Sequence, residues 1–156
     1  MAKVLEQLVR MNGVDIYTTY GAFLVEDKRG GMDNITALLT PSKLKNETTV
    51  NIREEDGEKN ASRLTSKNEA RDVELNFAIV QRGKAEWMKK YIAFVEFLKK
   101  GKDGWLNVEL PQLNLVLRMR YLTSSKFTPL SCLWVGGVQT HAAKFKVKFR
   151  EPKPII

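Results

Sequence analysis

The sequence predicts an α+β fold that is mainly β: a β-sandwich or partly open barrel packed by one long α-helix, in a single domain over residues 1–156. Residues 71–80 alternate apolar and polar side chains with a period of two, which is typical of a strand with one buried face. Residues 84–100 space their apolar side chains three and four apart, which is typical of an amphipathic helix. Because so broad an apolar stripe needs a surface to cover it, we expect the other segments to build a sheet beneath this helix.

The N-terminal segment, residues 9–26, is predicted to form two short strands. Asn12-Gly13 separates them, and Gly21 interrupts the apolar pattern again. Asn-Gly is a strong signal for a tight turn between strands, and because the flanking runs are short a β-bulge is the alternative here. Residues 33–41 are then predicted to make one helical turn, capped by Asp33 or Asn34 and ended by Pro41.

Residues 42–70 hold few large apolar groups and form the least globular part of the chain. Loops longer than roughly 12–15 residues are uncommon in compact domains and tend to be functional or disordered. One interpretation is a flexible surface loop. The other is a long polar hairpin arm, with strands around 48–53 and 61–64 and a turn at 55–58, that orders against another subunit. Candidate subunit-interface residues in this arm are Lys43, Lys45, Val50, Ile52 and Arg53.

The central helix is predicted to end at Gly101 in a left-handed cap, with Lys99 and Lys100 in its last turn. Its apolar stripe comprises Trp87, Met88, Tyr91, Ile92, Phe94, Val95 and Leu98. Residues 105–110 then return to an extended pattern, and residues 113–121 alternate again. We expect these two segments to pair as a hairpin closed near Pro111-Gln112.

A further strand is predicted from Phe127, Leu130, Leu133 and Val135, ending at Gly136-Gly137. The last strand has the clearest alternation in the chain. Its apolar face comprises Ala143, Phe145, Val147 and Phe149, and its other face comprises Lys144, Lys146, Lys148 and Arg150. Four cations on one strand face repel one another. Two arrangements relieve this: water together with acidic residues on the neighbouring strand, or an acidic surface on a partner protein or nucleic acid. The four cations are therefore candidate subunit-interface residues as well.

The formal net charge of +8 raises the question of nucleic-acid binding, because basic proteins often bind nucleic acids. The excess charge is spread along the chain, with no block of five or six like charges. Charged stretches of a sequence usually form solvated faces rather than binding sites. A basic nucleic-acid-binding module is therefore kept only as the alternative function. No apolar run approaches the roughly 18–20 residues that cross a bilayer, and the N-terminus lacks the apolar core of a secretory signal. We therefore expect no membrane anchor.

The sequence offers little for catalysis. The single histidine, His141, has no surrounding Cys/His cluster, and no G-x-S-x-G motif precedes any serine. The single cysteine, Cys132, excludes an intrachain disulfide and lies in an apolar context typical of an inert buried thiol. The acidic residues around Gly57 lack the spacing of a calcium loop. We expect no enzymatic activity, no metal and no cofactor.

The order of the predicted elements resembles the tail-tube fold, which bacteriophage tube proteins, distal tail proteins and contractile-injection tubes share. Within that group the sequence is similar to prophage tail proteins of the distal-tail type. The residues that carry the resemblance are Asp15-Ile16-Tyr17 with Tyr20-Gly21, Arg71-Asp72-Val73 leading into Leu75-Asn76-Phe77, Trp87 to Leu98, and Phe145 to Pro154. The likeness covers most of the chain.

This resemblance implies a non-enzymatic virion component: one subunit of a homo-oligomeric ring, commonly a hexamer, in the virion tail. Copies would join sheet edges around a lumen that DNA or a tape-measure protein crosses only in passing. Other tail proteins would be its partners, and assembly would take place in the bacterial host cytoplasm. Distal tail proteins often carry a second, C-terminal domain. This chain ends after its last predicted strand, so we expect it to represent the ring-forming domain.

Overall fold

The computed structural model describes residues 6–45, 49–50, 53–54, 56–60, 62–63, 66–131 and 139–156. Its elements are, in chain order, β1 (Arg10–Met11), β2 (Val14–Asp15), α2 (Ile16–Tyr20), β3 (Ala22–Leu24), α3 (Asp33–Leu39), β4 (Thr49–Val50), β5 (Lys59–Asn60), β6 (Arg71–Arg82), α4 (Lys84–Lys100), β7 (Leu106–Leu110), η1 (Pro111–Leu113), β8 (Leu115–Pro129) and β9 (Thr140–Glu151). A seven-stranded sheet has the order β2-β1-β7-β8-β9-β6-β3, and β4 and β5 form a separate two-stranded sheet. Every strand pair is antiparallel.

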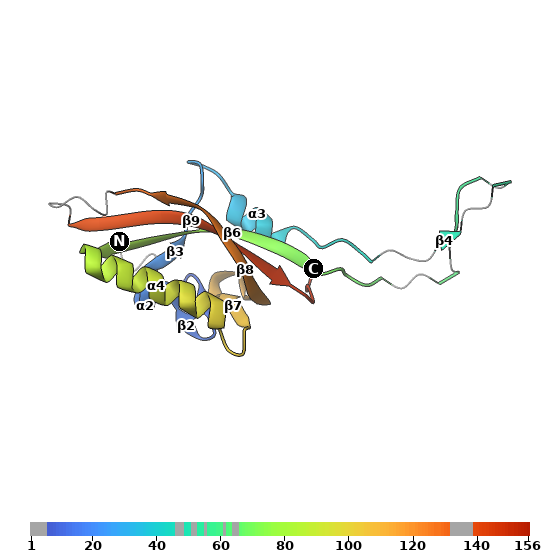
Figure 1. Cartoon of the computed structure of the whole chain (residues 1–156). Helices are drawn as coiled ribbons and strands as arrows, with labels where there is room; N and C mark the ends of the chain where they lie inside the picture. The colour runs from blue at the N-terminus through green and yellow to red at the C-terminus, as the bar shows by residue number, and fades with distance from the viewer. Residues whose placement is uncertain are drawn as a thin grey trace.

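The predicted fold class is confirmed. The large sheet curves into a half-barrel, and α4 lies along one of its faces (Figure 1). Trp87, Phe94 and Leu98 of α4 are fully buried against the sheet. The Trp87 indole nitrogen donates to the backbone oxygen of Ile79 at 3.0 Å, and the Phe94 ring lies 5.6 Å from the Phe77 ring. Burial of these large side chains is what fixes the helix to the sheet.

Two long strands form the middle of the sheet. β6 pairs with β9 along its whole length, from Arg71↔Glu151 to Arg82↔Thr140. The apolar face predicted for the last strand is confirmed, because residues 143, 145, 147 and 149 are all buried. In β6, by contrast, Asn76 and Ala78 are buried on the face opposite Phe77 and Leu75. The centre of β6 is therefore covered on both sides.

β8 changes its partner along its length. Leu115–Met119 pair with β7, as the predicted hairpin requires, and Arg120–Pro129 pair with β9. Two register shifts interrupt the β8–β9 ladder, and such bulges bend a strand and increase its twist. The prediction of a separate strand starting at Phe127 was wrong, because Phe127 belongs to the continuous β8. Leu133 and Val135 lie outside the described residues.

The N-terminal segment differs from its prediction. The Asn12-Gly13 turn is confirmed, with φ of 53° and 79° at its two residues. The second strand is shorter than predicted, because helix α2 replaces its continuation. Asp15 starts this helix by accepting bonds from the Tyr17 N–H at 3.3 Å and the Thr18 hydroxyl at 2.6 Å. An N-cap of this kind outweighs the strand preference of the β-branched and aromatic residues that follow.

Two predicted helix caps also need correction. Neither Asp33 nor Asn34 caps α3: the Glu26 carboxylate accepts from the Asp33 N–H at 2.7 Å, and Asn34 is buried with its amide donating to Val25. Gly101 does end α4 at a positive φ of 49°, but its ψ of −142° is outside the left-handed helical region. In the apolar stripe of α4, Met88 and Ile92 are exposed rather than buried. Periodicity alone overestimated the width of the face that the sheet covers.

Candidate subunit interface

The basic face of β9 already has acidic neighbours. Arg150 donates to Asp72 at 2.9 Å, and Lys146 and Lys148 each lie 3.8 Å from the Glu74 carboxylate on β6. Lys144 lies 3.3 Å from the Asp27 carboxylate. The structure therefore realises the arrangement in which partly solvated cations face carboxylates from neighbouring segments of the same chain.

The pairing leaves some positive charge on this face. Glu74 serves two lysines, and Lys126 on β8 lines the same shallow depression as Lys144 and Lys146 without an ion pair among the described residues. The hydrogen bond from Lys144 and the charges of the surrounding lysines hold the pKa of Asp27 below its ordinary value. Asp27 thus stays ionised to lower pH than a free aspartate.

The predicted arm residues lie apart from this face. β4 and β5 sit well away from the large sheet, joined to it by the segments on either side (Figure 1). Lys43, Lys45, Val50 and Arg53 are exposed, and Ile52 lies outside the described residues. Within the described residues the hairpin pairs Thr49↔Asn60 and Val50↔Lys59. Of the second strand predicted around 61–64, residues 62 and 63 are not in a strand, and residues 61 and 64 lie outside the described part of the chain. The eight predicted interface residues that the structure describes accordingly form two separate groups.

The base of the arm is fixed to the body. Leu44 and Asn68 pair across it, with bonds from the Lys45 N–H to the Lys67 oxygen at 2.8 Å and from the Glu69 N–H to the Lys43 oxygen at 2.7 Å. Ser42 donates through its N–H and its hydroxyl to the C-terminal Ile156 oxygen. The last residues of the chain therefore pack beside the root of the arm, as their positions in Figure 1 also show.

A buried ion pair supports this root. The Arg71 guanidinium donates to Glu151 at 2.6 Å, to the Thr40 oxygen at 2.6 Å and to the Leu38 oxygen at 2.9 Å. Its side chain is 8% exposed and that of Glu151 is 1% exposed. The Arg71 side chain therefore joins the start of β6 to the end of β9 and to the end of α3. Sequence reasoning missed this pair because its members are 80 residues apart.

The sheet has free strand edges. Within the part of the chain that the structure describes, β3 pairs only with β6, over three residues, and β2 pairs only with β1. Beyond Met119, β8 pairs only with β9, so the opposite edge of Arg120–Pro129 has no strand beside it among the described residues. Free edges offer unpaired N–H and C=O groups to another chain. Pro129 at the end of β8 fits an edge position, where a missing N–H is tolerated.

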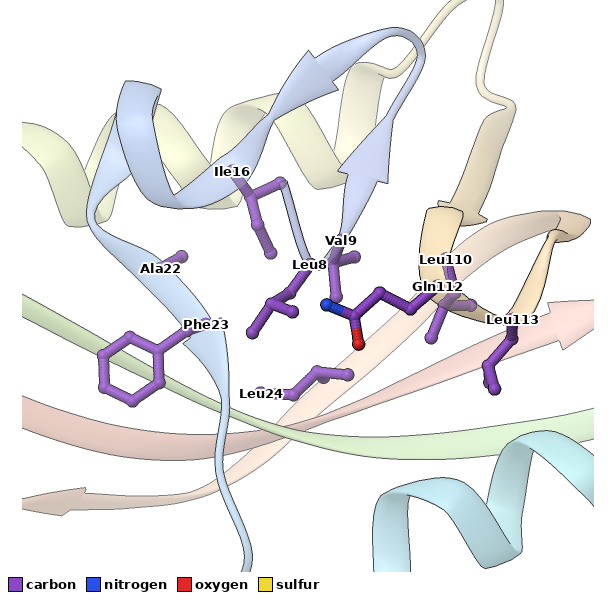
Figure 2. Close-up of a pocket in the computed structure, with 9 residues that line it drawn as sticks. All are labelled: Leu8, Val9, Ile16, Ala22, Phe23, Leu24, Leu110, Gln112 and Leu113. Atoms are coloured by element: carbon purple, nitrogen blue, oxygen red, sulfur yellow. The ribbon is translucent and has the colours of Figure 1, made fainter. Parts of the chain in front are cut away.

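An apolar pocket of about 220 Å³ opens between β3 and η1. Figure 2 shows side chains from both walls projecting into it. The lining residues are Leu8, Val9, Ile16, Ala22, Phe23, Leu24, Leu110, Gln112 and Leu113. None of these described lining residues is titratable.

The single histidine does not complete a catalytic arrangement among the described residues. His141 is fully buried, and its Nδ1 lies 3.3 Å from the Ser131 hydroxyl, which accepts from the Ala142 N–H. No carboxylate of a described residue orients the imidazole, and no described residue forms a hydrogen bond with its Nε2. The described residues also contain no cluster of His, Cys, Asp or Glu that could hold a metal ion, and Cys132 lies outside them. None of the described helices is both long and apolar enough to cross a bilayer.

Comparison with known proteins adds one informative result. No protein-family model matches the sequence, and no curated protein sequence matches it significantly. Among solved structures, the fold is similar to that of a phage tail hub component. This is SPP1 Dit (gp 19.1), described as a paradigm of the hub adsorption apparatus in phages that infect Gram-positive bacteria. The TM-score is 0.57 at 16% sequence identity, and the match covers 92% of this chain and 49% of SPP1 Dit. The chain thus shares a Dit-like fold and spans about half the length of that protein.

Proposed function

We propose that this protein is a structural, non-enzymatic subunit of a ring in a phage or prophage tail, of the distal-tail or tail-tube type. The observation that carries the proposal is the Dit-like fold, which extends over 92% of the chain. The pocket without titratable groups and the unsupported histidine favour a structural role over catalysis. In this proposal the protein resides in the virion tail, after assembly in the host cytoplasm, and contacts other tail proteins.

The free strand edges support the proposed ring. The edge of β8 and the edge of β3 differ in length and sequence, so a contact between them joins one copy to the next head to tail. Such heterologous contacts close into a ring when the rotation between copies allows it. A closed ring, which we propose to be a hexamer, would cover both edges of every subunit and leave a lumen through which DNA passes.

The arm supplies a second contact in this proposal. Its exposed residues Lys43, Lys45, Val50 and Arg53, together with Ile52, would meet the neighbouring subunit or the next ring. Val50 is 53% exposed, so this apolar side chain is available for a contact with another subunit. The β9 cations Lys144, Lys146, Lys148 and Arg150 are proposed to contact a subunit or the lumen through the charge that Asp27, Asp72 and Glu74 leave uncompensated.

The alternative, a basic nucleic-acid-binding module, has less support. The β9 cations already contact carboxylates, and the phenylalanines of the same strand point into the core, where they cannot stack on bases. DNA affinity that falls steeply with salt in the unassembled protein would favour this alternative.

The proposal is tested by light scattering of the purified protein over a range of concentrations. We expect a mass of several subunits that falls on dilution. A matched variant replaces residues 46–65 with a short Gly-Ser turn, which keeps the Leu44–Asn68 pairing and the Arg71 contacts. We expect this variant to unfold at nearly the same temperature but to assemble less well. A monomeric wild-type protein at every concentration would overturn the proposal.

A further inference from the structure

Four of the protein's 18 acidic residues lie within five positions of one another near the end of the arm. Glu54, Asp56 and Glu58 are all exposed, and Glu55 adds a fourth carboxylate to the same stretch of sequence. None of the three described carboxylates forms an ion pair with a described residue. In a chain with a net charge of +8, this acidic tip (residues 54–58) has the opposite sign to the net charge of the protein and can attract a basic surface.

The root of the arm has the opposite charge. A groove of about 600 Å³ lies there between the arm and the C-terminal segment. Lys45, Lys67 and Lys153 line it, and none of the described lining residues is acidic. Its walls are held together: the Lys45 N–H bonds to the Lys67 oxygen, and the Asn68 amide lies 3.4 Å from the Pro154 oxygen. The three lysines therefore face one ordered depression from two segments far apart in the sequence.

The groove lysines and the β9 cations are both possible binding surfaces for an acidic segment, and they differ in whether the cations are already paired. Each β9 cation has a carboxylate within 4 Å, from Asp27, Glu74 or Asp72. No described carboxylate forms an ion pair with a groove lysine. An incoming acidic segment would gain more from lysines that are unpaired than from lysines whose existing partners it must displace.

We propose that the acidic tip of one copy docks in the basic root groove of the next copy. β4 lies far from the C-terminus in Figure 1, so the tip does not reach the groove of its own chain in this arrangement. Each copy offers one tip and one groove, which makes the contact heterologous and able to propagate around a ring. The inference rests on the proposed ring and names the neighbouring surface that the arm would contact.

Zero-length carbodiimide cross-linking tests the contact directly, because this reagent joins a carboxylate to an amine only when the two touch. A mixture of ¹⁵N-labelled and unlabelled full-length protein distinguishes cross-links between copies from those within one copy. We expect mixed-isotope peptides that join Glu54, Asp56 or Glu58 to Lys45, Lys67 or Lys153. An oligomer in which these carboxylates cross-link only to other lysines would overturn the docking site and leave the ring intact. A protein with no oligomer and no cross-link between copies would overturn both.

Charge reversal provides an independent readout. We expect Glu54→Lys/Glu58→Lys, and separately Lys45→Glu/Lys67→Glu, to raise the concentration needed for half-assembly on the order of tenfold. A chain that carries all four changes restores opposite charges and should recover most of the assembly. Lys28→Glu/Lys89→Glu lowers the net charge by the same amount as Lys45→Glu/Lys67→Glu, at exposed positions outside the groove, and should change assembly little. Equal effects from the groove and control variants would refute the docking site.

Discussion

Replacement of Arg71 by methionine should destabilise the fold strongly, although Arg71 is neither apolar nor part of the aromatic core. The charged guanidinium of Arg71 is buried away from water. Hydrogen bonds to one carboxylate and two backbone oxygens offset the cost of burying this charge. Without Arg71, Glu151 is left 1% exposed with no cation beside it, and Leu38 and Thr40 each lose a donor.

The magnitude follows from that geometry. Breaking a buried pair by removing one partner costs about 3–5 kcal/mol, because the remaining charge stays desolvated. With a urea dependence of about 2 kcal/mol per molar, the unfolding midpoint should fall by about 2 M. The double variant Arg71→Met/Glu151→Met should lose less stability than Arg71→Met alone, because it leaves no buried charge.

Urea titration followed by tryptophan fluorescence measures these differences. The control is Asp72→Asn, which breaks the ion pair between Arg150 and Asp72. The charged atoms of this pair lie 2.9 Å apart, close to the 2.6 Å of the Arg71–Glu151 pair, but its side chains are 41% and 37% exposed. Pairs of this kind contribute at most about 1 kcal/mol. The assigned role of the pair would be wrong if Arg71→Met lost no more stability than Asp72→Asn. It would also be wrong if the double variant lost as much stability as Arg71→Met and Glu151→Met do together as single changes.

Three further outcomes follow from the packing and charges. Phe94→Ala should cost about 3–5 kcal/mol in urea unfolding, whereas Ile92→Ala, on the exposed side of the same helix, should stay within about 0.5 kcal/mol; similar losses would contradict the assigned helix face. Gly101→Ala should cost about 1–3 kcal/mol in the same assay, because a Cβ there would collide with backbone and φ is positive; a neutral change would refute this geometry. NMR titration should give Asp27 a pKa below the ordinary value. Because this pKa is lowered in the folded state, the carboxylate stabilises the fold at neutral pH and that contribution is lost as the pH falls through it. Lys144→Met should raise the value, and an unchanged pKa would exclude the lysine as the cause.

The parts of the fold that were predictable are those in which periodicity and local chemistry agree. The helix over 84–100 and the strand over 140–151 combine a clear period with a strong terminator, Gly101 in one case and the Pro152-containing segment in the other. The Asn12-Gly13 turn is equally local. The order of the predicted elements resembled the tail-tube fold, and the comparison of structures shows a Dit-like fold.

The errors arose where a neighbour far away in sequence decided the outcome. Glu26 takes over the capping of α3, which frees Asn34 to bond with Val25 and to accept from the Asn76 N–H. β8 continues through Phe127 because β9 provides a partner for its second half. The candidate interface was partly predictable, since charge alternation identified the β9 cations. Their carboxylate partners depend on the register of β6 and on the loop that carries Asp27, which no short motif encodes.

Electron microscopy of the purified protein at high concentration tests the central claim most directly. The claim is that free sheet edges and a projecting arm join copies of this chain head to tail into a closed assembly. Negative-stain images should show annular particles of uniform diameter with a central hole, and the arm-replacement variant should show fewer of them. Uniformly monomeric particles, or open filaments without closed rings, would contradict the claim.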